Sequence, residues 1–423
     1  MINAAPRLQT LPSSSQSPGH IELIDLLRIF AVLAVVMFHY GYRGAAADGF
    51  TDVHLPQGAD VLKYGYFGVQ LFFVISGFVI AYSAGDRSFT EFAIARIARI
   101  YPGFVACMTA TFLVTIALGA PRFQATASQW LANLAIVAPA FKQAFMDGAY
   151  WSIVYEIVFY GWIGILIATR LFKRSIENVL VIWLAVSVIN EAVLHSSALR
   201  YLLLTDQSGF FAAGVLLYRI HSRQADFASF IGLVFAAATG ALQAIIGLEP
   251  LRVRFAIPYD DAVAGALSIG CVAAVALTLV VKRIPLPSRL LVAGGAITYP
   301  FYLLHQHIGF IVFSHIQYRA HPELIIGGMI VAVTILSWLV WRCVEKPAQR
   351  ALKLFLRSLS DKVQKGFRAR SGSPLSAMPG EPIAAKSQLR RPLRSGYSAA
   401  AESQVRPPAF INQSSDPACR SEP

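Results

Sequence analysis

Long apolar runs recur along the whole chain and set the first structural expectation. Each run has about 20 residues, which is enough for a helix to cross a hydrocarbon core roughly 30 Å thick. The runs lack the alternation of apolar and polar residues that a lipid-facing β-strand shows, so helices are expected rather than a barrel. We predict ten spans, at residues 24–42, 64–84, 98–119, 148–170, 177–194, 201–220, 227–248, 257–281, 290–315 and 324–344.

The composition agrees with a membrane protein. Of the 423 residues, 56% are hydrophobic and only 14% are charged, whereas a soluble domain carries about 25% charged residues. The predicted fold is therefore an all-α, polytopic membrane helix bundle of about ten transmembrane helices, formed by residues 21–350. A further apolar segment, 130–141, is too short to cross a bilayer and is expected to be re-entrant or interfacial.

The two ends of the chain differ from the membrane region in composition. Residues 1–20 are polar and rich in Ser, Pro and Gln, which predicts a disordered lead-in. Residues 351–423 are expected to form a basic, largely disordered tail without a second catalytic domain. Ala45-Ala46-Ala47 resembles the end of a cleavable signal peptide, but the long polar lead-in and the charged Asp25 and Arg28 favour a retained span.

The net charge of +13 has a membrane explanation. Lys and Arg lie in short loops and in the tail, where they orient helices and contact anionic headgroups, and the loop bias predicts both termini in the cytoplasm. The chain contains no nucleic-acid-binding motif, so the lipid bilayer is the expected partner and nucleic acid is not. The four cysteines have no spacing typical of zinc sites or disulfide frameworks, and no metal site is predicted.

Charged residues in the first span indicate chemistry. Asp25 and Arg28 are three residues apart and can pair on one helix face. His39 follows Arg28 by eleven residues, which places it within about 20° of the same direction and about 16 Å further along the axis. One alternative is that Arg28 reaches the headgroups and His39 caps the helix. On a shared face, however, Arg28 suits the phosphates of a soluble donor and His39 suits a general base.

Two later spans add charged candidates. Arg96 and Arg99 are three residues apart at the start of the third span, where they either anchor the helix or join Arg28 in binding phosphates. Glu156 lies within the fourth span, near Trp151, and can either orient His39 or pair with an arginine. We interpret Glu156 as a site residue.

The ninth span carries a polar stripe. Tyr299, Tyr302 and His305 recur every three residues, which is deeper in the span than an interfacial aromatic belt explains. His305 and His307 point about 200° apart, so they are not a helical metal pair. We predict that His305 faces an internal cavity.

The spacing of Arg28 and His39 resembles that of the acyltransferase-3 family of membrane-bound O-acyltransferases, and further segments resemble this family in the same order. Pro300 replaces a small or polar residue that the family favours, and Leu27 occupies a position that is often next to glycine. The similar segments are Phe72 to Phe78, Arg96 to Pro102, Trp151 to Glu156 with Phe159-Tyr160, Phe210 to Gly214, Thr298 to His305, and Glu345-Lys346-Pro347.

The resemblance implies transfer of an acyl group, usually acetyl, from cytoplasmic acetyl-CoA to a hydroxyl of a cell-surface or exported glycan, by a multi-pass protein of a bacterial-type inner membrane. The acceptor stays open among exopolysaccharide, O-antigen, a lipo-oligosaccharide and a small molecule. Combined with the patterns above, the resemblance predicts catalytic roles for His39, Glu156 and Arg28. It also predicts that Arg28, Arg96 and Arg99 bind the donor. The predicted substrate cavity includes Asp25, Trp151, Tyr299, Tyr302 and His305.

Two other classes of function use the same features. A secondary transporter or flippase could employ Asp25, Arg28, His39 and Glu156 as a proton or substrate pathway, although the sequence shows no convincing internal repeat. A structural or regulatory membrane protein could recruit partners through its tail. The oligomeric state is not predicted.

Overall fold

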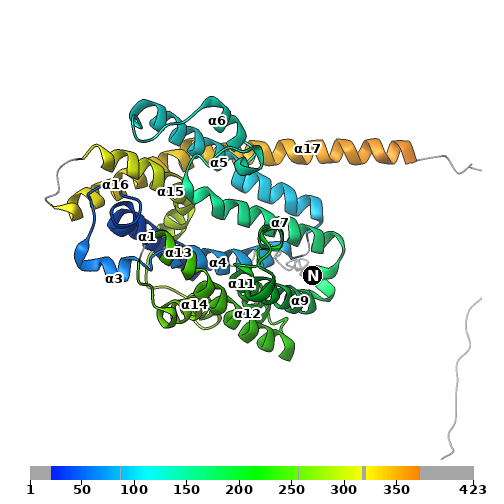
Figure 1. Ribbon diagram of the computed structural model, residues 1–423. Helices are drawn as coiled ribbons and strands as arrows, with labels where there is room; N and C mark the ends of the chain where they lie inside the picture. The colour runs from blue at the N-terminus through cyan, green and yellow to red at the C-terminus, as the bar shows by residue number, and fades with distance from the viewer. Residues whose placement is uncertain (1–20, 86, 256, 317–320, 372–423) are drawn as a thin grey trace, which may run out of the picture. The chain divides into compact units, whose positions relative to one another are not determined.

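The computed structural model describes residues 21–85, 87–255, 257–316 and 321–371, and every regular element in these ranges is helical (Figure 1). The predicted all-α membrane bundle is therefore confirmed. Among the described residues, eight helical stretches are long and apolar enough to cross a membrane: Glu22–Ala46, Pro56–Ala84, Phe89–Leu118, Gly148–Ala168, Ile176–Leu194, Phe227–Val253, Asp261–Leu279 and Pro322–Lys365. The predicted span 290–315 corresponds to the 27-residue helix α15 (Ser288–Ser314), whose polar residues lower its hydropathy.

The first helix has a central place in the packing. Helix α1 (Glu22–Phe38) lies against α4 (Phe67–Ala84) and α15, and α15 also contacts α5 (Phe89–Leu118) and α16 (Pro322–Val340). On its other side α4 contacts α7 (Trp151–Ala168), α11 (Ser208–His221) and α14 (Asp261–Ala276). Helices α9 (Ile176–Ile189) and α12 (Phe227–Ile246) pack against α11 and against each other.

Glycines allow α4 and α11 to approach closely. A Cβ atom on Gly77 would overlap the backbone of Phe211, and one on Gly214 would overlap the backbone of Val74. Small residues at helix contacts are typical of membrane bundles, because they bring the backbones into van der Waals contact. Gly77 therefore serves packing, and the neighbouring Ser76 is free to face the other side of α4.

Helix α5 begins earlier than predicted. Its N-terminus is closed by a capping box, in which the Ser88 side chain accepts from the Glu91 N–H and the Glu91 side chain accepts from the Ser88 N–H. The apolar pattern predicted a start at residue 98, because the charged Arg96 interrupts it. The segment predicted to be too short to cross forms α6 (Ala127–Asn133) and the 3₁₀ turn η3 (Ala138–Phe141).

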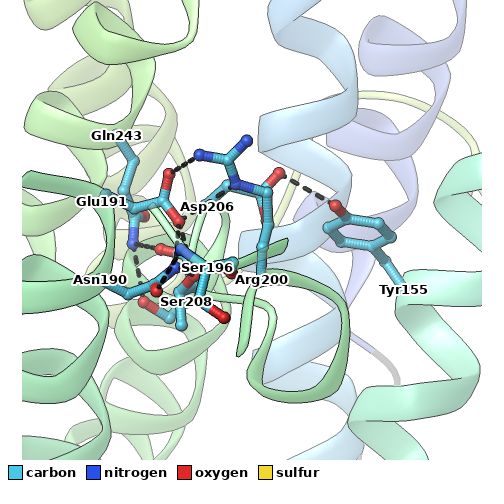
Figure 2. Close-up of polar contacts among 9 residues, drawn as sticks. Tyr155, Asn190, Glu191, Ser196, Arg200, Asp206, Ser208 and Gln243 are labelled. Atoms are coloured by element: carbon cyan, nitrogen blue, oxygen red, sulfur yellow. Dashed lines mark hydrogen bonds and ion pairs between the residues drawn. The ribbon is translucent and has the colours of Figure 1, made fainter. Parts of the chain in front are cut away.

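The prediction of one continuous span over 201–220 is wrong. Helix α10 (Ser197–Leu203) ends at Leu204, which adopts a left-handed conformation, and α11 starts only at Ser208. The intervening loop joins a buried polar cluster at the end of α9 (Figure 2). Glu191 is at its centre and accepts hydrogen bonds from Asn190, Arg200 and Thr205. Thr205, the first residue of the polar run between the two helices, is thus bonded within this cluster.

A long helix also replaces part of the predicted tail. Helix α17 spans Lys346–Ser371, so the expectation of a disordered segment is wrong for residues 351–371. Its exposed side chains are amphipathic, with Phe355, Leu359 and Val363 on one face and Lys353 and Arg357 on the other. The remaining tail, 372–423, and the predicted lead-in, 1–20, lie outside the described residues.

Candidate active site

Five helices, α1, α4, α5, α7 and α15, surround a cavity of about 330 Å³. Its lining is mostly apolar along α4 and mostly polar on the other helices. The polar side chains that line it are those of Arg28, Ser76, Arg96, Arg99, Ser152, Glu156, Tyr160, Thr298, Tyr299 and Tyr302. Six residues selected from the sequence are in this set, namely Arg28, Arg96, Arg99, Glu156, Tyr299 and Tyr302.

One end of the cavity is cationic. Arg28, Arg96 and Arg99 all line it, although they come from two helices. Arg28 forms an ion pair of 3.3 Å with Asp25, which stands behind it and does not line the cavity. The Arg96 guanidinium lies 5.9 Å from the ring centroids of both Phe92 and Tyr160. Three guanidinium groups at one end of a cavity favour an anionic ligand, such as a phosphate.

Arg99 is held in place by the chain that follows α16. Its Nη1 atom is 2.5 Å from Oε1 of Glu345, a fully buried carboxylate. Gln349 donates to both the same Glu345 oxygen, at 2.8 Å, and the Arg99 carbonyl, at 3.2 Å. The sequence offered Glu345 only as part of a resembling motif, and its role as the partner of Arg99 was missed.

Glu156 lies among the arginines. It lines the cavity with Arg28 and Arg96, and accepts a hydrogen bond of 3.0 Å from Ser76. The side chains within hydrogen-bond distance of the His39 ring are instead those of His305 and Arg43, among the described residues. Two roles were considered for Glu156. The prediction that it orients His39 is wrong, whereas a role beside the arginines is compatible with its position in the cavity lining.

A tyrosine and a serine close the opposite end, where the Tyr302 and Ser152 hydroxyl oxygens are 2.8 Å apart. Tyr299 is on the cationic side: its ring centroid is 5.6 Å from the Arg99 guanidinium, and its hydroxyl donates to the Ile100 carbonyl at 3.1 Å. Trp151 does not reach the cavity. Its ring packs edge-on against Phe73 and Tyr155, so its predicted place in the cavity lining is wrong.

His39 and His305 meet one helical turn beyond Tyr302. His305 Nε2 and His39 Nδ1 are 3.0 Å apart, and both side chains are buried. Neither residue lines the cavity, so the prediction that His305 faces it is wrong. The Tyr302 ring, whose centroid is 5.5 Å from that of His305, lies between this pair and the cavity.

Hydrogen bonding assigns the tautomers of the two neutral rings. His305 Nδ1 is 2.7 Å from the Tyr302 carbonyl oxygen, which can only accept, so Nδ1 carries the proton. In neutral His305, Nε2 is therefore an acceptor for His39 Nδ1–H. The unprotonated nitrogen of neutral His39 is then Nε2, which can act as a base.

A buried carboxylate positions this region from outside the spans. Asp147 precedes α7 and accepts from the Ala149 N–H at 2.8 Å and from the His307 N–H at 2.9 Å. Burial raises the pKa of Asp147 to about 6, and the two N–H donors oppose the rise. The start of α7, with Ser152, is thereby tied to α15, with Tyr302 and His305.

Comparisons with known proteins address the same region. A family profile described as an acyltransferase domain matches residues 21–342, which is most of the chain and covers all five helices of the cavity. The chain belongs to this acyltransferase family. Glu345 and Gln349, which hold Arg99, lie just beyond the matched residues.

Two curated relatives are similar over short stretches. Acyltransferase MdmB of Streptomyces mycarofaciens is 37% identical over 98 residues, which are 23% of this chain and 22% of the relative. Protein 2 in picA locus of Rhizobium radiobacter is 38% identical over 92 residues, which are 19% of this chain and 48% of the relative. The match thus spans less than half the length of either relative. No solved structure matches the chain.

For a member of the acyltransferase family, the geometry separates two tasks. The arginines gather at one end of the cavity, and the His39–His305 pair lies beyond the other end. Arg28 and His39 are eleven residues apart in one helical segment, so about 16 Å of helix separates them. A long donor with an anionic head and a reactive tail suits such a site.

Proposed function

We propose that this protein transfers an acetyl group from acetyl-CoA to a hydroxyl of a cell-surface or exported glycan. The observation that carries the proposal is the cavity with three arginines at one end and a hydrogen-bonded histidine pair beyond the other. Family membership supports acyl transfer as the reaction class. The donor, the acceptor and placement in a bacterial-type inner membrane are part of the proposal.

The donor is expected to bind with its phosphates at the cationic end. Arg28 and Arg96 offer several N–H donors each, and guanidinium groups bind phosphate oxygens in pairs. Arg99 is oriented by Glu345, which also offsets part of its charge. The pantetheine arm then extends along the cavity toward Tyr302 and Ser152, and the thioester passes this point to reach His39.

The chemical step uses His39 as general base. The acceptor oxygen attacks the thioester carbonyl carbon while His39 Nε2 takes its proton. The carbon–sulfur bond then breaks, the new ester forms, and His39 returns the proton to the departing CoA thiolate. His305 holds the His39 ring through the 3.0 Å hydrogen bond. Because both rings are buried, water competes poorly with the acceptor.

Purified protein in detergent is expected to consume acetyl-CoA when a hydroxyl acceptor is supplied. CoA release is measured with a thiol reagent, with glycan from cells lacking the protein as acceptor. Mass spectrometry of surface glycans from cells with and without the protein then identifies the ester. A secondary transporter would leave acetyl-CoA intact in detergent, where no gradient exists, and that result would overturn the proposal.

Replacing Arg96 by alanine is expected to raise the KM for acetyl-CoA about 10-fold with little change in kcat. The reason is the loss of one charge-assisted contact, worth about 1.5 kcal/mol, from donor binding. Steady-state kinetics over a range of acetyl-CoA concentrations measures both constants. Arg289→Ala, at an exposed residue near the start of α15, is the control and is expected to change neither. An unchanged KM in Arg96→Ala would remove Arg96 from the donor site.

A further inference from the structure

Arg43 lies on the side of His39 that faces away from His305. The two residues open and close the π-helical turn η1 (His39–Arg43) that follows α1. Arg43 Nη1 is 3.5 Å from His39 Nε2, and Arg43 Nε is 2.9 Å from Oδ2 of Asp48. The Arg43 side chain is 24% exposed and that of Asp48 is 7% exposed. Asp48 thus contacts the guanidinium at Nε, while Nη1 is directed at the imidazole.

The tautomer argument makes this contact chemically specific. His39 Nδ1 is engaged with His305, so the unprotonated nitrogen that can take a proton is Nε2. Arg43 Nη1, which can only donate, is 3.5 Å from that nitrogen, so this long contact must be exchanged for the substrate hydroxyl when the acceptor binds. Arg28, by contrast, lies eleven residues before His39 in the same helical segment and lines the cavity at its cationic end.

The proposed reaction requires a cation at this position. Attack of the acceptor on a thioester places a full negative charge on the former carbonyl oxygen, and the base that takes the proton must lie beside the same carbon. Beside the buried His39 ring, that oxyanion needs fixed donors, and a guanidinium supplies several. Arg43 is beside His39 Nε2, where the reacting carbon must come.

We propose that Arg43 is a catalytic residue whose guanidinium binds the oxyanion of the tetrahedral intermediate, with Asp48 holding it in position. This inference rests on the proposed function. In the balanced step, the acceptor oxygen bonds to the carbonyl carbon, its proton moves to His39 Nε2, and the carbonyl electron pair moves onto the oxygen beside Arg43. Collapse restores the carbonyl, breaks the carbon–sulfur bond and transfers the proton to the thiolate.

The packing around Arg43 supports a built site rather than a loose surface charge. A Cβ atom on the next residue, Gly44, would lie 2.9 Å from Cε1 of Phe310 and 3.1 Å from the His39 carbonyl oxygen. Phe310 also stacks edge-on against the His39 ring, with centroids 6.0 Å apart. The turn that carries Arg43 therefore sits directly on the histidine pair, with little room to move away.

The decisive experiment compares Arg43→Ala, Arg43→Lys and wild-type protein with acetyl-CoA as donor and the cell-derived glycan as acceptor. We expect kcat to fall about 100- to 1000-fold in Arg43→Ala, with the KM for acetyl-CoA within about twofold of wild type because the donor phosphates bind elsewhere. Arg43→Lys should retain an intermediate kcat. Added guanidinium or methylguanidinium should restore part of the activity of Arg43→Ala, since Arg43 is partly exposed.

A matched ion pair provides the control. Arg252 pairs with Asp261 at 2.7 Å and has a similar side-chain exposure of 28%, so Arg252→Ala should leave kcat unchanged. A kcat above a third of the wild-type value in Arg43→Ala would overturn the proposal. So would an Arg43→Ala variant that added guanidinium does not reactivate, together with an Arg43→Lys variant that is as inactive as Arg43→Ala. If wild-type protein itself releases no CoA, the proposed function fails as well, and the two failures are thereby distinguished.

Discussion

Replacing His39 by alanine is expected to lower acyl transfer from acetyl-CoA by about 100- to 10,000-fold. The variant loses the general base, and the partner nitrogen of His305 cannot substitute, because His305 is fully buried one turn beyond the cavity and its Nδ1 is bound to the Tyr302 carbonyl. The measurement is kcat at saturating acetyl-CoA in detergent, with the melting temperature recorded to establish that the variant is folded.

Three further variants sharpen this test. His39→Gln keeps a polar side chain without a base and should be as inactive as alanine. His305→Ala removes only the group that orients His39, so a smaller loss in kcat is expected. His315→Ala is the control, because His315 is exposed and its ring is hydrogen-bonded to the Leu118 carbonyl, away from the His39–His305 pair. Wild-type turnover in His39→Ala would contradict the mechanism.

Replacing Glu191 by alanine is expected to lower the free energy of unfolding by about 3 kcal/mol. Glu191 is buried and accepts from Arg200, Thr205 and Asn190, so its loss leaves several donors without an acceptor (Figure 2). The expected value is at the lower end of the range for broken buried ion pairs, because the Arg200 side chain is 36% exposed and can turn toward solvent. Thermal unfolding in detergent measures the change.

The matched control for this stability prediction is Glu249→Ala. Glu249 pairs with Arg252 at 3.8 Å, but its side chain is 70% exposed. An exposed ion pair is worth about 1 kcal/mol or less, so only a small shift in melting temperature is expected. Equal shifts in both variants would mean that the polar cluster does not brace the turn between α10 and α11.

The helical membrane architecture could be predicted because its cause is local. Each span is recognisable as a run of about 20 apolar residues, and the helical period of 3.6 residues decides which side chains share a face. The same reasoning placed Arg96 and Arg99 together, and the structure has both lining the cavity. Boundaries were less certain where polar residues interrupt the pattern, as at the start of α5 and in the loop after Leu204.

Long-range partners could not be predicted from local patterns. Glu345 is 246 residues from Arg99, and no periodicity links them, so the carboxylate that orients this arginine was missed. Glu156 was correctly singled out as an intramembrane charge, but which of its two candidate partners it approaches depends on how α7 packs against α4. The serine contact from Ser76 and the nearby arginines place it at the cationic end.

The sequence by itself determined that this chain is a membrane helix bundle and that Arg28 and His39 lie along one helical segment, because hydrophobicity and helical period act between near neighbours. Only the tertiary structure decided what those residues meet. It brought His305 to His39 across 266 residues, set Tyr302 between that pair and the cavity, and turned Arg43 toward His39 Nε2. These contacts follow from the packing of α1 against α15, which depends on the shapes of both helices together.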